Sequence, residues 1–88
     1  MHPPDPTPGS VTVQVLLFAG LREQLGTDSV RRSVSPGTTV AELYASLFPS
    51  GPEGRLPVLY AMDQEYVPGS TPVRDGAEVA LLPPLGGG

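Results

Sequence analysis

The stretch TVAELYASLF, residues 39–48, carries the clearest structural signal in the sequence. Thr39 and Glu42 have the spacing of a capping box, in which two side chains satisfy backbone N–H groups at the start of a helix. The following PSGP, residues 49–52, cannot continue a helix. The stretch therefore predicts one amphipathic helix with a single apolar side. That side comprises Val40, Leu43, Tyr44, Leu47 and Phe48.

Segments with the pattern of β-strands precede this helix. VTVQVLLF, residues 11–18, alternates at first and then becomes apolar at every position. We therefore expect a strand that starts half exposed and ends buried on both sides, so that Phe18 belongs to the core when it is considered alone. A short helical turn that ends at Gly26 follows. The weaker strand at residues 29–35 contains two arginines, which favours the edge of a sheet.

Three further strands are predicted after the helix. PVLYAM, residues 57–62, and EYV, residues 65–67, are separated by a turn at Asp63-Gln64. PGSTPVRDG, residues 68–76, is an irregular crossing that ends in an Asp75-Gly76 turn. AEVALLPP, residues 77–84, is apolar at nearly every position, which is typical of a central strand covered on both faces. Leu59, Leu81 and Leu82 are therefore core candidates when each is considered alone.

This order of elements predicts an α+β domain with a mixed sheet and one main helix packed across one face. The β-grasp (ubiquitin-like) fold has this order. We divide the chain into a disordered proline-rich leader (1–10), a β-grasp domain (11–85) and a flexible glycine tail (86–88). Four prolines in the leader favour extended, solvated chain.

Composition excludes several classes of function. The chain of 88 residues has no cysteine, so it has neither disulfides nor a thiol nucleophile, and its one histidine, His2, is too isolated to form a metal site. A net charge of -4 argues against nucleic-acid binding. No apolar run is long enough to span a membrane, and the first residues lack the features of a signal peptide, so we expect a cytoplasmic protein.

The last residues, LLPPLGGG (81–88), raise the question of what three terminal glycines do. A glycine tail can enter a narrow channel that side chains would block, but ordering it costs about 1–2 kcal/mol per residue. A partner must therefore supply that free energy. Pro83 and Pro84 stiffen the exit from the last strand and direct the tail away from the sheet.

Several motifs, taken in order, resemble the molybdopterin synthase small subunit family, which belongs to the ThiS/MoaD sulfur carriers. They are VTVQVLLFAGLREQLGTD (11–28), DQEYV (63–67), DGAEVALLPP (75–84) and the terminal Gly87-Gly88. The chain departs from that family at Asp63, at the Leu81-Leu82 pair and at Gly86. These departures leave open a sister family of sulfur carriers that serve thiamine, tRNA or cysteine synthesis.

The resemblance implies a role for the tail. An E1-like activating enzyme uses ATP to adenylate the carboxylate of Gly88, and sulfur then converts it to a thiocarboxylate that donates sulfur for molybdopterin synthesis. Gly87 extends the reach of the tail. The family docks through an apolar sheet face, which implies partner contacts for Phe18, Leu82, Pro83, Pro84, Leu85 and Gly86. The expected complex is a hetero-oligomer in which a large subunit holds the substrate pocket, and this chain binds no cofactor or metal itself.

Two other readings stay open. A ubiquitin-like modifier, joined through Gly88 to lysines of other proteins, uses the same activated carboxylate. The chain has no lysine of its own to form side-chain-linked polymers. A non-covalent interaction module, with the leader or tail as a peptide ligand, is the third reading.

Overall fold

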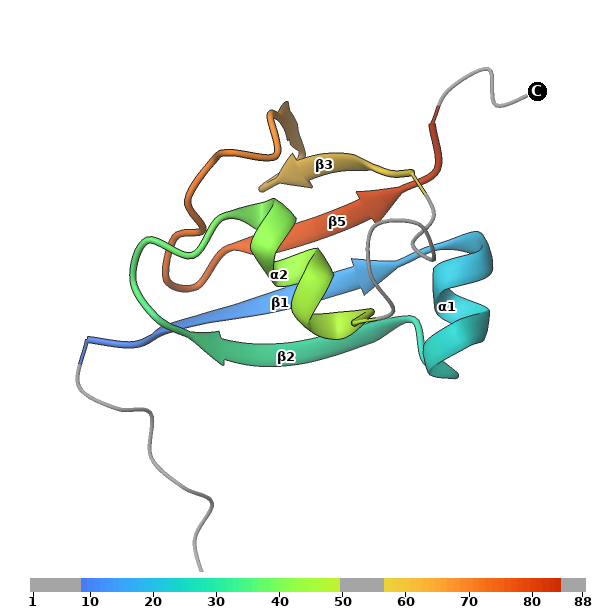
Figure 1. Ribbon diagram of the computed structural model, residues 1–88, viewed down its shortest axis with the longest axis horizontal. Coiled ribbons are helices and arrows are strands. Elements are labelled where there is room, and N and C mark those ends of the chain that lie inside the picture. The colour runs from blue at the N-terminus through green and yellow to red at the C-terminus, as the bar shows by residue number, and fades with distance from the viewer. Residues whose placement is uncertain (1–8, 50–56, 85–88) are drawn as a thin grey trace, which may run out of the picture.

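The computed structural model describes residues 9–49 and 57–84, which form five strands and two helices (Figure 1). The strands alternate with the helices only in the first half of this region. The elements are β1 (Val11–Leu17), α1 (Ala19–Leu25), β2 (Ser29–Val34), α2 (Val40–Leu47), β3 (Leu59–Met62), β4 (Glu65–Val67) and β5 (Glu78–Leu82).

The five strands form one mixed sheet in the order β2-β1-β5-β3-β4. β1 and β5 pair in parallel at its centre, in a register that runs from Gln14 opposite Glu78 to Leu17 opposite Leu81. The β2–β1, β5–β3 and β3–β4 pairs are antiparallel. As the arginines in β2 indicated, β2 lies at an edge of the sheet. The predicted α+β architecture with a mixed sheet is confirmed.

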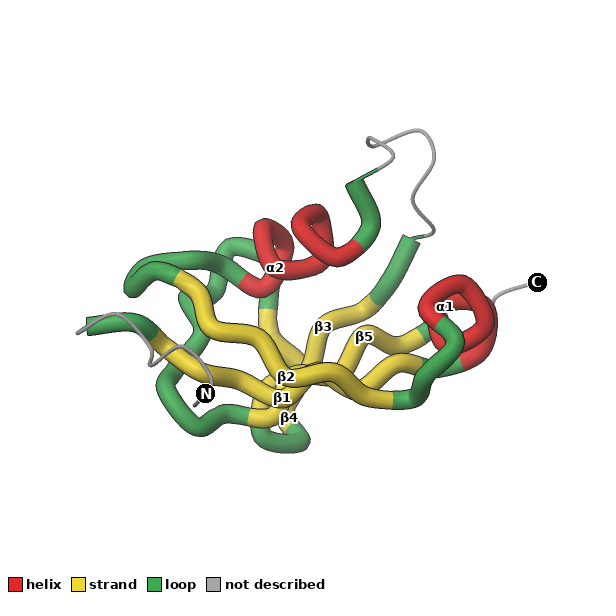
Figure 2. The backbone as a smooth tube through the Cα atoms, turned by 90° about the horizontal axis from the view of Figure 1, so that it is seen from below, coloured by secondary structure: helices red, strands yellow, loops and turns green. Residues whose placement is uncertain are grey.

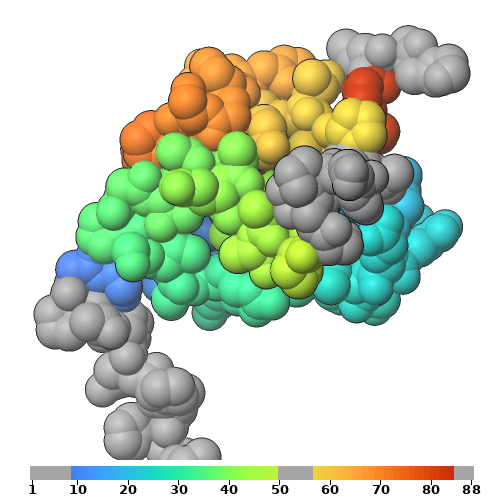
Figure 3. Space-filling model, viewed as in Figure 1, coloured from blue at the N-terminus to red at the C-terminus, as the bar shows by residue number. Residues whose placement is uncertain are grey.

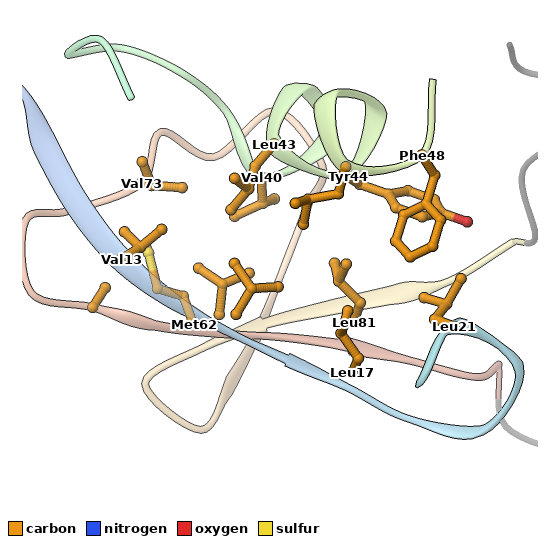
Figure 4. Close-up of a cluster of buried hydrophobic side chains, with 14 residues drawn as sticks. Val13, Leu17, Leu21, Val40, Leu43, Tyr44, Phe48, Met62, Val73 and Leu81 are labelled. Atoms are coloured by element: carbon orange, nitrogen blue, oxygen red, sulfur yellow. The ribbon is translucent and has the colours of Figure 1, made fainter. Parts of the chain in front are cut away.

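α2 lies across one side of the sheet and buries the apolar stripe that the sequence predicted (Figures 1 and 2). The space-filling view from this side shows the green atoms of α2 and its flanking residues over the strands (Figure 3). Tyr44 and Phe48 meet edge to face, with ring centroids 5.4 Å apart, above the sheet side chains (Figure 4). The core beneath α2 includes Val13, Val15, Leu17, Val79 and Leu81, each no more than 1% exposed.

The start of α2 is fixed by two sets of hydrogen bonds. The predicted capping box is present: Glu42 N donates to Thr39 Oγ1 at 3.1 Å, and Thr39 N donates to Glu42 Oε1 at 2.9 Å. The first backbone donors of the helix bond to the irregular crossing instead, at 2.9 Å for Val40 N to Thr71 O and 3.1 Å for Ala41 N to Gly69 O. Because these N–H groups have no partner inside the helix, the crossing determines where α2 begins.

Two predictions about burial are wrong. β1 ends at Leu17, and Phe18 is the N-cap of α1 with 39% of its surface exposed. β5 is central, but Ala80 and Leu82 on its second face are only half-buried. An apolar run shows that a strand is central, but it does not show that a second layer covers it. The short turn expected after β1 is also a complete helix, α1, which ends at Gly26 with φ 73°.

Three predicted features lie wholly or partly outside the described residues. The leader at 1–10 is described only at Gly9 and Ser10, and the loop before β3 falls largely within residues 50–56. The glycine tail and Leu85 also lie beyond residue 84. Within the described part of the chain, neither helix has the length and apolarity required to cross a membrane.

Neighbouring leucines of β5 test whether the second face of the sheet is open. We expect Leu81→Ala to lower the free energy of unfolding by about 2–5 kcal/mol, because Leu81 is fully buried under α2. The same truncation at half-buried Leu82 should cost about 1 kcal/mol or less. Urea unfolding of both variants measures the difference. Equal losses would mean that Leu82 belongs to the core.

Candidate functional site

The side of the sheet opposite α2 carries a continuous row of apolar residues. Strand register places Leu16 of β1 beside Ala80 of β5, Ala80 beside Ala61 of β3, and Ala61 beside Tyr66 of β4. Leu82 and Leu59 form the next pair toward the end of β5. We call these six residues, together with Phe18, the apolar patch.

Most of the apolar patch is accessible, although Ala61 in the middle of the row is buried, with 7% of its surface exposed. Tyr66 is 63% exposed and Phe18 is 39% exposed, at opposite ends of the row. Leu16, Leu59 and Leu82 are half-buried. Adjoining apolar side chains that stay at least partly accessible are typical of interaction sites, whereas single scattered ones are not. The patch is therefore a candidate binding surface.

The other half of this face is polar, and hydrogen bonds stabilise it. Thr12 N donates to Asp75 Oδ1 at 2.9 Å, and Glu78 N donates to Asp63 Oδ1 at 3.0 Å. The second carboxylate oxygen of Asp63 pairs with Arg74. The apolar patch thus ends at a polar border on one side. On the other side it extends to the end of the sheet from which the C-terminal segment leaves.

The backbone after β1 turns sharply at Phe18. Phe18 is extended, with φ -130° and ψ 155°, so its side chain continues the alternation of β1 and lies on the side of Leu16. Ala19 then adopts a left-handed φ of 51°, which costs a residue with a Cβ about 1–2 kcal/mol. α1 begins there, and Leu21 N donates to Phe18 O at 3.1 Å. This turn places an exposed aromatic ring beside the end of β1.

The exit of the C-terminal segment lies at the same end of the sheet. Because β1 and β5 are parallel, their carboxyl ends adjoin, and Phe18 lies near the end of β5. Leu82 is the last residue of β5, and the exposed Pro83 and Pro84 follow it. Leu85, Gly86, Gly87 and Gly88 lie outside the described residues, so the roles predicted for them stay predictions.

Potential metal ligands do not cluster in the described residues upstream of the tail. Within residues 9–49 and 57–84, no three potential metal ligands of the His, Cys, Asp and Glu types form a group. The ion pair between Arg74 and Asp63 is exposed and joins loops. This part of the molecule presents the candidate binding surface next to the exit of the C-terminal segment.

The structure places four of the predicted partner-contact residues at one end of the sheet: Phe18, Leu82, Pro83 and Pro84. Sequence reasoning missed Tyr66, Leu16 and the two alanines of the row. A detectable signal for Tyr66 was an aromatic residue in the three-residue edge strand EYV. Its place in the patch depends on strand register, which the sequence does not state.

Comparisons with known proteins agree with this architecture. The ThiS family profile matches residues 15–88. The chain is 37% identical over 82 residues to the molybdopterin synthase sulfur carrier subunit of Arabidopsis thaliana, covering 90% of this chain and 85% of the relative. It is 32% identical to the protein of the same name from Chlamydomonas reinhardtii, covering 86% of this chain and 98% of the relative.

Solved structures share the ubiquitin-like β-grasp fold. The small archaeal modifier protein 1 of H. volcanii superposes with a TM-score of 0.71 at 26% identity, covering 85% of this chain and 99% of that one. A chain in the complex of subunits 1 and 2 of the molybdopterin-converting factor from Helicobacter pylori gives a TM-score of 0.60 at 23% identity, covering 89% and 100%. The family profile and the curated relatives together show that this chain belongs to the ThiS family.

Proposed function

We propose that this chain is the sulfur carrier subunit of a molybdopterin synthase, which delivers sulfur from its C-terminus to a substrate held by a larger subunit. The curated relatives that cover most of the chain carry that name. The observation that carries the proposal is the position of the apolar patch at the sheet end from which the C-terminal segment leaves. A surface there can hold the domain on a partner while the tail reaches into it.

The proposed chemistry takes place on the carboxylate of Gly88. This carboxylate attacks the α-phosphorus of ATP on an activating enzyme, pyrophosphate leaves, and an acyl-adenylate forms. A nucleophile that carries sulfur at the level of sulfide then displaces AMP and leaves a C-terminal thiocarboxylate. Its sulfur, soft and ionised near neutral pH, attacks the substrate in the larger subunit and joins it to the tail as a thioester. Water then cleaves the acyl–sulfur bond, which leaves the sulfur on the substrate and returns the Gly88 carboxylate. ATP therefore belongs to the activating enzyme, and this chain supplies only the acyl group.

The proposal requires two partners that use the chain in turn. The large subunit is the expected binding partner, because the relatives are named as subunits of a synthase. Binding free energy from the apolar patch would offset the cost of ordering the tail, about 1–2 kcal/mol per residue. We propose that Phe18, Leu82 and Tyr66 provide the main contacts, since buried aromatic and apolar anchors carry most of the free energy of such interfaces.

Protein modification is the second candidate function, because the small archaeal modifier protein 1 has the same fold at 26% identity. ThiS family membership also fits carriers for other sulfur pathways. Intact-mass analysis of the chain purified from cells separates these functions. Replacement of one oxygen by sulfur indicates a carrier, whereas covalent adducts on other proteins indicate a modifier.

The position of the terminal carboxylate should determine activity. We expect deletion of Gly88, or addition of one residue after it, to leave the melting temperature unchanged and to abolish sulfur transfer. Each change moves the reacting atom by about 3.3–3.6 Å along an extended chain, whereas productive alignment holds to within about 1 Å. Thiocarboxylate formation and product formation with the large subunit measure the effect. Near-normal turnover by either variant would refute the proposed sulfur site.

The apolar patch should drive binding to the large subunit. We expect Leu82→Asp to weaken the complex by about 2–4 kcal/mol, because it places an uncompensated charge in an apolar contact. Ser33→Asp adds the same charge to the polar half of the same face and should change affinity little. Calorimetric titration measures both variants, and circular dichroism verifies that they are folded. A folded Leu82→Asp variant with normal affinity would place the interface elsewhere.

A further inference from the structure

A hollow adjoins the apolar patch where β1 meets α1. It is lined by Leu16, Leu17, Phe18, Arg22, Asp28 and Ser29. Leu16 and Phe18 belong to both the hollow and the patch, so a partner that covers the patch also reaches the hollow. Unlike the patch, the hollow contains two charged side chains of opposite sign.

Arg22 reaches this position through the geometry of α1. It lies in α1, after the extended N-cap Phe18, and it lines the hollow together with Leu16 and Phe18. Its backbone N–H bonds to Phe18 O at 3.5 Å, and its carbonyl accepts a hydrogen bond from Gly26 N at 2.8 Å. The backbone of Arg22 is thus held at both ends, while its side chain is exposed.

The guanidinium of Arg22 forms no ion pair within the described part of the chain. The one ion pair there joins Arg74 to Asp63, although Asp28 lines the same hollow as Arg22. The remaining described arginines lie elsewhere. In the strand register, Arg31 lies opposite Gln14, in the polar half of the open face. Arg32 lies opposite Val13, whose side chain faces α2. Among the described arginines, Arg22 is the one that lines the hollow together with Leu16 and Phe18 of the apolar patch.

We propose that Arg22 binds a carboxylate side chain of the large subunit and so fixes how that subunit sits on the apolar patch. This inference rests on the proposed function. A guanidinium is more weakly hydrated than other charged groups and offers a planar fork that fits a carboxylate. When a partner covers the hollow, Arg22 loses its water at low cost and gains a bidentate acceptor. Asp28, on the β2 side of the hollow, repels the same carboxylate and limits the affinity.

Opposite responses of the two charged residues test the proposal. We expect Arg22→Gln to raise the Kd for the large subunit about tenfold or more. Asp28→Asn should lower the Kd, because it removes the repulsion. Arg32→Gln removes the same charge from outside the hollow and should change the Kd by less than about threefold. Calorimetric titration at low and high salt measures all three, and the loss at Arg22 should shrink at high salt.

Two results would overturn the proposal. Equal effects of Arg22→Gln and Arg32→Gln would show that only net charge matters. Weaker binding of Asp28→Asn with unchanged binding of Arg22→Gln would show that the partner presents a cation to the hollow. Either result leaves the proposed function intact if Leu82→Asp still weakens the complex and Gly88 still carries sulfur. Failure of the wild-type chain to bind the large subunit would instead refute the proposed function.

Discussion

β1 and β5 pair in parallel at the centre of the sheet, and the other features of the molecule depend on that pairing. Parallel strands end at the same edge, so the turn at Phe18 and the exit at Pro83 lie at one end of the domain. An antiparallel pairing would separate them by the length of the strand. The pairing also requires a long connection between the two strands, and this connection contains α2, which covers one face of both.

The two faces of the central strands differ in burial although both are largely apolar. α2 and the crossing beneath its N-terminus bury Val79 and Leu81 completely, while Ala80 and Leu82 stay half-buried on the other side. Hydrogen bonds join the first turn of α2 to the irregular crossing at residues 68–76 and hold the helix on one face of the sheet. The domain therefore completes its core with one layer and keeps an apolar surface available.

The parts of the structure that depend on local pattern could be predicted from the sequence. The stripe from Val40 to Phe48, the capping box and the edge position of β2 follow from spacing and composition. Exposure of Phe18 could not be predicted from the strand pattern, because an apolar residue at the end of a strand has the same pattern whether a second layer covers it or not. Only the family resemblance implied a partner contact for this residue. Tyr66 joins the patch only through the register of β3 with β4 and β5, which involves contacts distant in sequence.

The central claim is that the sheet face opposite α2 receives the partner. Nuclear magnetic resonance of the isotopically labelled chain, titrated with the large subunit, tests this claim most directly. We predict that chemical-shift changes and line broadening concentrate at Leu16, Phe18, Tyr66, Ala80 and Leu82, and that amides of the exposed side of α2 change little. Changes concentrated on α2, with an unaffected apolar patch, would contradict the account.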